Sequence, residues 1–269
     1  MKYTDLRNIN DINILKRECT QLVADRTEYI RETLLRAILD SGDTLSKVES
    51  MSGLSLSYLF RMLEEQNDRA FSLPIEKLGG LLSHYNLSPH KLLFGESMVI
   101  ELPILEDKLA RTLDNFYSKK DRADLIANLK EDRAKLESRR AYRIGFDDAQ
   151  GFMEFFYNRS AILVQCIGAT YPEKNCRAFL PDATTRLANT YSLNERITLK
   201  NLVSHAVRYG TSVDYLLVED YAKLNDLMLR DGTLVENEQI RTIIGILVSL
   251  EEEEYIKFTS EILLKAIQS

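Results

Sequence analysis

Tryptophan is absent from this chain of 269 residues, and proline (five) and cysteine (three) are scarce. The scarcity of proline leaves long stretches free to form helix, because proline interrupts helices. Cys19, Cys166 and Cys176 are too widely spread to suggest a disulfide framework, and together with His205 they lack the spacing of a metal site. We therefore expect no disulfide, no metal and no cofactor.

Long apolar runs are missing as well, since no stretch of about 18 uninterrupted apolar residues occurs. The chain begins with charges at Lys2, Asp5 and Arg7, which is not the pattern of a signal peptide. These two absences predict a soluble, cytoplasmic protein that has no membrane partner.

The motifs of common enzyme classes are also absent. The sequence contains no glycine-rich nucleotide-binding motif, no HExxH and no GxSxG. The three histidines, His84, His90 and His205, lie within helical patterns, and the sequence gives none of them an evident acidic or nucleophilic partner. The sequence predicts a protein that is not an enzyme.

What the chain does contain is one apolar pattern present twice, 124 residues apart. Each copy predicts a helix, a turn at Asn86 or Gly210, a serine cap and a short helix that ends in Leu-Leu. The repeat predicts two copies of one small helical domain. The matching positions are Ile75, Leu78, Leu82, Tyr85, Ser88, Leu92 and Leu93 in the first copy, and Leu199, Leu202, Ala206, Tyr209, Ser212, Leu216 and Leu217 in the second.

A helix–turn–helix pattern precedes the first copy. A helical stretch over 29–39 ends at Ser41-Gly42, and a second short helix follows over 45–51. In Gly53-Leu54-Ser55, glycine permits a left-handed turn, leucine points to the core and serine caps a third helix. Two helices joined by a tight glycine turn are the plan of a helix–turn–helix motif.

The run over 53–64, followed by Ser72-Leu73-Pro74 and Leu92-Leu93-Phe94-Gly95, resembles the five-helix DNA-binding domain of the phage-repressor and Cro family over residues 26–96. The segment from Phe179 to Asn189 aligns more loosely with the turn and recognition helix, with Pro181 where that family usually has glycine. The resemblance implies an all-α chain with tandem five-helix helix–turn–helix domains.

Four segments follow from this reading. Residues 1–97 form the first helix–turn–helix domain, and 98–145 form a connector with helices over 105–116 and 121–138. Residues 146–220 form a second, divergent helix–turn–helix-like domain. Residues 221–269 contribute two amphipathic helices, which either dimerise or cover the core of the second domain.

The resemblance also implies which residues meet DNA, because the recognition helix of this family enters the major groove. Arg61 is the strongest candidate, since its guanidinium can address guanine O6 and N7 together. Leu54, Leu59 and Met62 are expected in the core. The implied DNA-binding residues are Ser55, Leu56, Ser57, Tyr58, Arg61, Asn67 and Arg69 in the first domain, and Thr184, Thr185, Arg186 and Asn189 in the second.

The predicted function is a sequence-specific transcriptional regulator of repressor type, related to a phage or mobile element, that binds double-stranded DNA as a homodimer. Release of repression would then need an inducer, either a protein or a small ligand. Three features leave an alternative to DNA binding open. They are the net charge of −6, Glu49 in place of a small residue, and the apolar side chains of Leu56 and Phe60. In that alternative the fold is a protein-interaction module that inhibits a protein partner, as an antirepressor would. Basic residues form two local groups, over 119–122 and over 133–143, and the second group is either a solvated helix face or a set of phosphate contacts.

Overall fold

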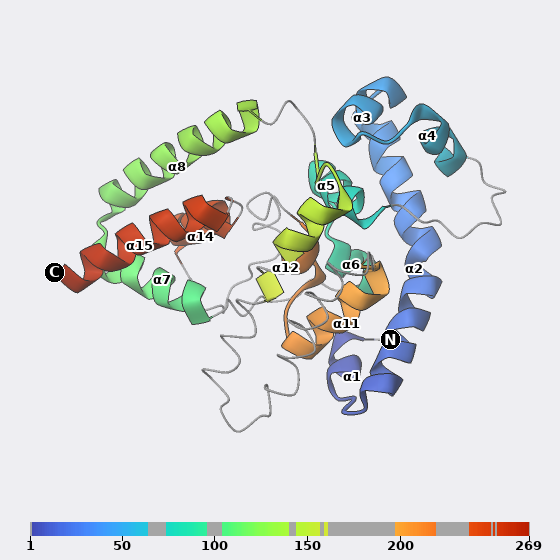
Figure 1. Cartoon of the computed structure of the whole chain (residues 1–269), viewed down its shortest axis with the longest axis horizontal. Coiled ribbons are helices and arrows are strands. Elements are labelled where there is room, and N and C mark those ends of the chain that lie inside the picture. The colour runs from blue at the N-terminus through green and yellow to red at the C-terminus, as the bar shows by residue number, and fades with distance from the viewer. Residues whose placement is uncertain are drawn as a thin grey trace. The chain divides into compact units, whose positions relative to one another are not determined.

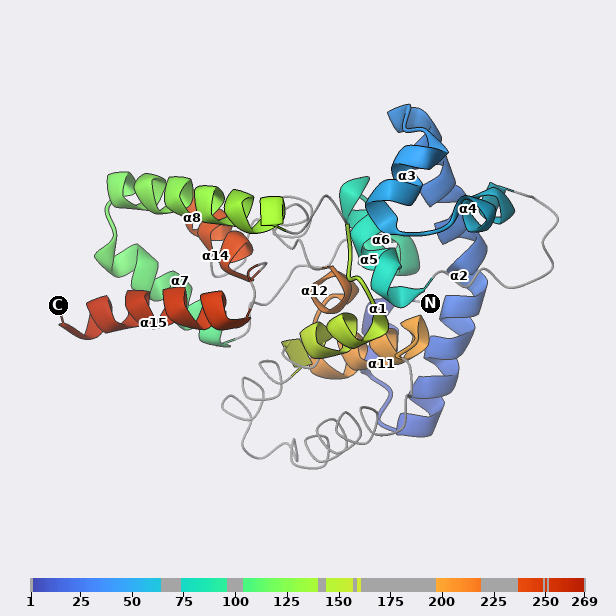
Figure 2. The same cartoon turned by 45° about the horizontal axis from the view of Figure 1, so that its top comes forward.

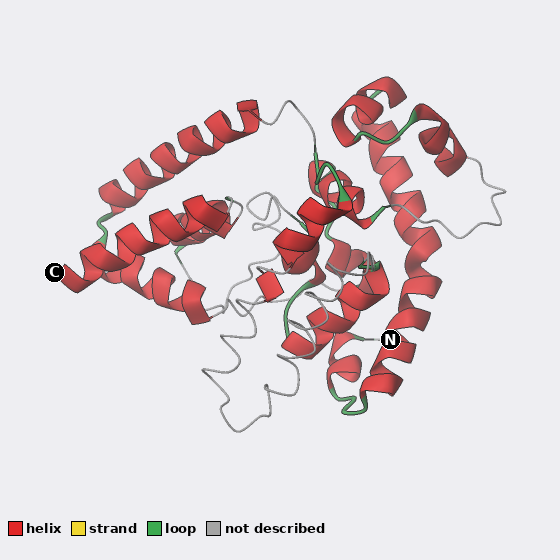
Figure 3. Cartoon of the chain, in the orientation of Figure 1, coloured by secondary structure: helices red, strands yellow, loops and turns green. Residues whose placement is uncertain are grey.

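The computed structural model describes residues 2–63, 74–95, 104–139, 144–156, 159–160, 197–218, 237–248, 250 and 252–268. Every regular element in these ranges is an α-helix (Figure 3), which confirms the all-α prediction. The chain divides into two compact units. The N-terminal unit comprises Met1–Met98, Tyr142–Phe156 and Asn194–Glu219; the C-terminal unit comprises Val99–Ala141, Tyr157–Leu193 and Asp220–Ser269.

The N-terminal unit is arranged along one long helix, α2 (Ile12–Ser41). Figures 1 and 2 show α3 and α4 at the C-terminal end of α2, and α1 and α11 beside its N-terminal half. A further helix spans 149–156. The other helices of the unit are α1 (Tyr3–Arg7), α3 (Leu45–Ser52), α4 (Leu56–Leu63), α5 (Ile75–His84), α6 (Pro89–Phe94), α11 (Leu199–Tyr209) and α12 (Val213–Leu217).

Local chemistry sets both ends of α2. The Asp11 carboxylate accepts hydrogen bonds from the backbone N–H groups of Asn13 (2.7 Å) and Ile14 (3.2 Å), which caps the first turn. Gly42 ends the helix in the left-handed conformation, with φ of 72°, where the sequence predicted the end. The helix begins well before the predicted stretch over 29–39.

The repeated pattern folds as predicted in both copies. The turn residue is left-handed each time, with φ of 55° at Asn86 and 68° at Gly210. The serine that follows caps a short helix each time, because Ser88 Oγ accepts from the N–H of Lys91 at 3.2 Å and Ser212 Oγ from that of Tyr215 at 3.0 Å. Asn and Gly tolerate positive φ best, which explains their presence at equivalent places.

The two copies pack against each other through α6 and α12. Asp214 Oδ2 accepts from Ser88 Oγ (3.1 Å) and from the backbone N–H of His90 (3.3 Å). In return, the backbone N–H of Val213 donates to His90 Nδ1 at 3.4 Å. His90 and Asp214 each stand two residues after the cap serine of their own copy, so equivalent side chains satisfy the first turn of the opposite helix. We call these four residues the repeat interface.

The repeat interface is buried, and burial changes the protonation of its ionisable groups. His90 is 1% exposed and Asp214 is fully buried. Burial raises the pKa of Asp214 to about 7 and lowers the pKa of His90 to about 4, because both charged forms lose hydration. Nδ1 of His90 accepts a hydrogen bond, which fits a neutral ring.

Three glycines allow backbones to touch around α5. A Cβ at Gly79 would lie 2.1 Å from the carbonyl oxygen of Leu217 at the end of α12, and one at Gly80 would lie 2.3 Å from the nitrogen of Gly145. Nearby, the Lys77 ammonium is buried and donates to the carbonyls of Phe146 (2.6 Å) and Asp147 (3.3 Å). The segment from 144 to 147 is thereby fixed across the start of α5.

The second copy therefore lies in the same compact unit as the first. The two compact units cut across the four predicted segments, since α11 and α12 of segment 146–220 belong with residues 1–98. Tyr3 adds to this grouping, because its hydroxyl donates to the carbonyls of Ala206 (3.1 Å) and Thr211 (2.8 Å). Residues 161–196, which include the predicted second recognition helix, lie outside the described ranges.

The C-terminal unit contains α7 (Ile104–Phe116), α8 (Lys119–Arg139), α14 (Glu238–Val248) and α15 (Glu252–Gln268). These elements match the helices predicted over 105–116, 121–138 and the tail. The central helix is α14, which packs against the other three, and its side chains at Ile243, Ile244 and Leu247 are buried. The tail helices are thus packed on the predicted connector helices.

Candidate nucleic-acid interface

Helices α3 and α4 form the predicted helix–turn–helix pair. Gly53 ends α3 in the left-handed conformation, with φ of 68°. Leu54 is 5% exposed and fills the core below the turn, and Ser55 Oγ accepts from the backbone N–H of Tyr58 at 3.3 Å. Each of the three turn residues has the role that its chemistry predicted.

Glu49 has a role in this turn that the sequence did not indicate. Its carboxylate accepts a hydrogen bond from the backbone N–H of Leu56 at 3.0 Å, so a residue of α3 caps the first N–H of α4. Ser52 supports the same turn, because its hydroxyl donates to the Val48 carbonyl (2.6 Å) and accepts from the Leu54 N–H (3.2 Å). The glutamate that departs from the family pattern thus fixes the position of α4 on α3.

Replacing Glu49 with Ala should lower the free energy of unfolding of the N-terminal unit by about 1 kcal/mol, because one N–H at the start of α4 loses its acceptor. Glu49→Gln should cost less, since its amide oxygen can still accept. Urea titrations followed by circular dichroism would measure both variants. Equal stability of Glu49→Ala and the parent protein would show that the cap contributes nothing.

One face of α4 is exposed to solvent and the other is in the core. Ser55, Ser57 and Arg61 are exposed, whereas Leu59 is 2% exposed and packs inward as predicted. Leu56 and Tyr58 are half-buried, so Leu56 points outward less fully than predicted. The fully exposed positions described on α4, Ser57 and Arg61, are therefore polar.

Arg61 is held in place by its own helix. Its Nε donates to the Ser57 carbonyl at 3.2 Å, and its guanidinium carbon lies 5.8 Å from the centre of the Tyr58 ring. A guanidinium over an aromatic ring is held by a cation–π interaction. The Arg61 side chain is exposed, so its other guanidinium N–H groups are accessible from solvent.

Six of the predicted DNA-binding residues lie outside the described ranges. They are Asn67, Arg69, Thr184, Thr185, Arg186 and Asn189. The side chains of Phe60 and Met62 on α4 are not described either. Ser55, Leu56, Ser57, Tyr58 and Arg61 are thus the predicted residues that the structure brings together.

Comparison with known proteins adds no relative. No family profile, curated protein or solved structure matches this chain significantly. In the described residues, no three His, Cys, Asp or Glu side chains are grouped so that they could hold a metal ion. None of the described helices is both long enough and apolar enough to cross a bilayer.

A polar cluster at the start of α3 corrects one expectation about the histidines. His84 was expected to lack an acidic partner, but its Nε2 lies 3.6 Å from the Asp43 carboxylate. Asp43 also accepts from the Tyr85 hydroxyl at 3.0 Å and pairs with Lys47, and the hydrogen bond from Lys47 lowers the pKa of Asp43. The cluster joins the loop before α3 to the end of α5.

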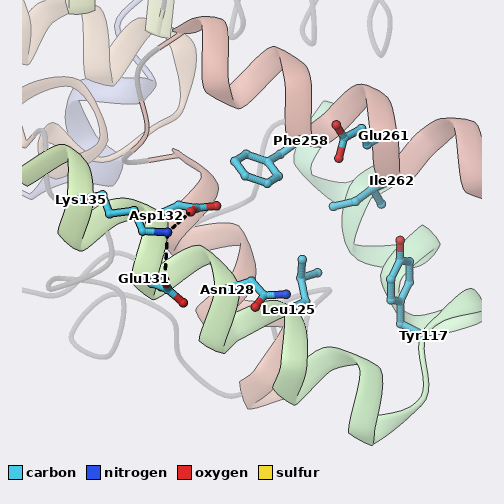
Figure 4. Close-up of a pocket in the computed structure, with 9 residues that line it drawn as sticks. All are labelled: Tyr117, Leu125, Asn128, Glu131, Asp132, Lys135, Phe258, Glu261 and Ile262. Atoms are coloured by element: carbon cyan, nitrogen blue, oxygen red, sulfur yellow. Dashed lines mark hydrogen bonds and ion pairs between the residues drawn. The ribbon is translucent and has the colours of Figure 1, made fainter.

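Two basic residues of α8, Lys135 and Arg122, have acidic neighbours. Lys135 Nζ lies 2.9 Å from Glu131 and 3.5 Å from Asp132, and these residues line one side of a cleft of about 400 Å³ between α8 and α15 (Figure 4). Arg122 is buried and pairs with Asp114 at 3.1 Å. The two pairs of Lys135 favour a solvated, internally balanced helix face over a phosphate contact at this residue.

Proposed function

We propose that this chain is a sequence-specific, double-stranded-DNA-binding transcriptional regulator of repressor type, related to a phage or mobile element, that acts as a homodimer without catalysing a reaction. The observation that carries the proposal is the α3–α4 pair, in which Leu54 and Leu59 are buried while Ser57 and Arg61 are exposed on one side of α4. A second helix held at such a turn can present its N-terminal half to the major groove.

In this proposal α4 is the recognition helix, and each described candidate has a distinct role. Arg61 reads a guanine through its free N–H groups, while Ser57 and the partly exposed edge of Leu56 contact base edges. Ser55 and Tyr58 lie toward the phosphates and set the position of α4 along the duplex. Asn67 and Arg69 would contact phosphates, and Thr184, Thr185, Arg186 and Asn189 would serve a second, divergent reader.

Arg61→Ala should weaken specific binding by roughly 1–3 kcal/mol and relax preference at one base pair, because the bidentate contact is lost. Arg61→Lys should recover only part of the affinity, since an ammonium cannot make both hydrogen bonds in a plane. Mobility-shift assays would measure the affinity of both variants for the DNA that lies upstream of the gene encoding this protein, at low and at moderate salt.

A matched control separates specific from general electrostatic effects. Lys130→Ala removes one exposed positive charge from α8, a helix of the other compact unit, and should leave specific binding unchanged. Unaltered DNA retention by Arg61→Ala at low salt would refute the assignment of α4 as the reader.

The alternative is a protein-interaction module, and two observations favour it. The chain carries a net charge of −6, whereas DNA binding draws much of its affinity from basic residues at phosphates. Leu56 places a half-exposed apolar group on the same face of α4. If the chain inhibits a protein partner, Leu56→Ser should abolish capture of that partner, and no DNA fragment should be retained at any salt concentration.

A further inference from the structure

The outward face of α15 carries two large apolar side chains that its own unit does not cover. Ile256 is 53% exposed and Leu264 is 54% exposed, while Tyr255, Thr259 and Ile262 on the opposite side are buried. Residues eight apart lie near one another around a helix, so Ile256 and Leu264 belong to one stripe. Ser260 lies midway between them and is exposed. The stripe therefore has apolar ends and a small, polar middle.

The charges beside this stripe are arranged so that the face complements itself. Lys257 and Glu261 are both exposed, and both flank the stripe on the side of the cleft between α8 and α15, whose edge Glu261 also lines (Figure 4). In two antiparallel helices related by a twofold axis at Ser260, Ile256 lies opposite Leu264 of the second copy, and the reverse holds as well. Because the twofold axis keeps the flanks of both copies on one side of the helix pair, the flanking residues of one copy meet those of the other. Lys257 then lies within about half a helical turn of Glu261 of the second copy. Two apolar contacts and two ion pairs form at once.

We propose that this face of α15, defined by Ile256, Lys257, Ser260, Glu261 and Leu264, is a twofold interface with a second copy of this chain. A surface that is complementary to itself in both apolar and charge pattern fits an isologous contact better than contact with an unrelated protein. The serine at the axis lets the two helices approach closely. The repeat interface cannot serve this purpose, because α12 of the same chain already covers α6.

The inference deepens the proposed function, on which it rests for its consequence: a dimer would supply two copies of α4 to one DNA site, and two linked readers raise affinity through effective concentration. Association itself requires no DNA. The self-association and the DNA binding can therefore fail independently.

The test is a charge exchange on the full-length chain, with molar mass measured by sedimentation equilibrium in the absence of DNA. Lys257→Glu and Glu261→Lys should each raise the dimer dissociation constant about tenfold, because each places like charges together at two symmetric points. The double variant K257E/E261K restores both ion pairs with reversed sign and should return to within about threefold of the parent protein. Lys130→Glu, on the exposed side of α8, is the control and should change nothing.

An apolar variant keeps the test decisive. Ile256→Ser should give a monomer that keeps the helical circular dichroism of the parent protein, since Ile256 is exposed in the single chain. A parent protein that is monomeric at roughly 50 µM, single charge variants that dimerise like the parent, or a double variant that stays as weak as the single ones would each overturn the inference. If a dimer forms as described but no DNA is retained, the interface stands and the proposed function falls.

Discussion

Replacing Asp214 with Asn is expected to make the protein more stable than the parent at pH 8 and about equally stable near pH 4. Burial raises the pKa of Asp214 to about 7, above the ordinary value of 3.8, so the folded state binds a proton that the unfolded state has lost. The stability of the parent therefore falls as the pH rises from about 4 to about 7. Asparagine does not titrate, and its amide oxygen can accept from Ser88 and His90 as the carboxylate does.

The difference in the free energy of unfolding between the two proteins should grow by roughly 4 kcal/mol across this window, in favour of the variant. The depressed pKa of His90 destabilises the fold as the pH falls below about 6.5, but it acts on both proteins and cancels in the difference. Urea titrations at several pH values would measure this difference in the free energy of unfolding between Asp214→Asn and the parent protein. Asp25→Asn on the exposed face of α2 is the control, and a pH-independent difference for Asp214→Asn would contradict the expectation.

Replacing Gly79 with Ala is expected to destabilise the N-terminal unit by roughly 3 kcal/mol or more. The added Cβ would lie 2.1 Å from the backbone oxygen of Leu217, and a backbone atom cannot move aside as a flexible side chain can. Helices α5 and α12 would have to separate, which would also strain the repeat interface. Thermal melting of the full chain would measure the loss.

Gly151→Ala is the matched control, because it makes the same chemical change within a helix. A Cβ at Gly151 would meet its nearest neighbour at 3.7 Å, an ordinary contact. Alanine favours helix over glycine, so this variant should be neutral or more stable by up to about 1 kcal/mol. Similar melting temperatures for the two variants would mean that α5 and α12 are not in close contact.

The sequence predicted those structural features that depend only on residues close together along the chain. Gly42, Gly53, Asn86 and Gly210 lie at left-handed turns because few other residues adopt that conformation, and serine caps follow from side-chain reach alone. Helices α7 and α8 and the two tail helices, α14 and α15, were predicted from their apolar periodicity. These features need no knowledge of what packs on what.

The pairing of helices far apart in the chain was not predictable in this way. His90 and Asp214 are polar residues in the first turn of short helices, where exposure is the usual outcome, yet both are buried against each other's helix. Their equivalent positions in the two copies were the available signal. Glu49 was likewise interpreted only as a departure from a family pattern. Its role as a cap depends on the position of the backbone N–H of Leu56 at the start of α4, which the sequence does not give.

The repeat interface also has a consequence for the order of events during synthesis. Helix α12 leaves the ribosome 124 residues after α6, which at roughly 5–20 residues per second is a delay of about 6–25 s. During that interval the inner face of α6 and the close-packing surface at Gly79 lack the element that covers them in the finished protein. While the nascent chain ends between residues 98 and 194, it thus exposes apolar surface of α5 and α6 that α12 later covers, and such surface is of the kind that chaperones bind.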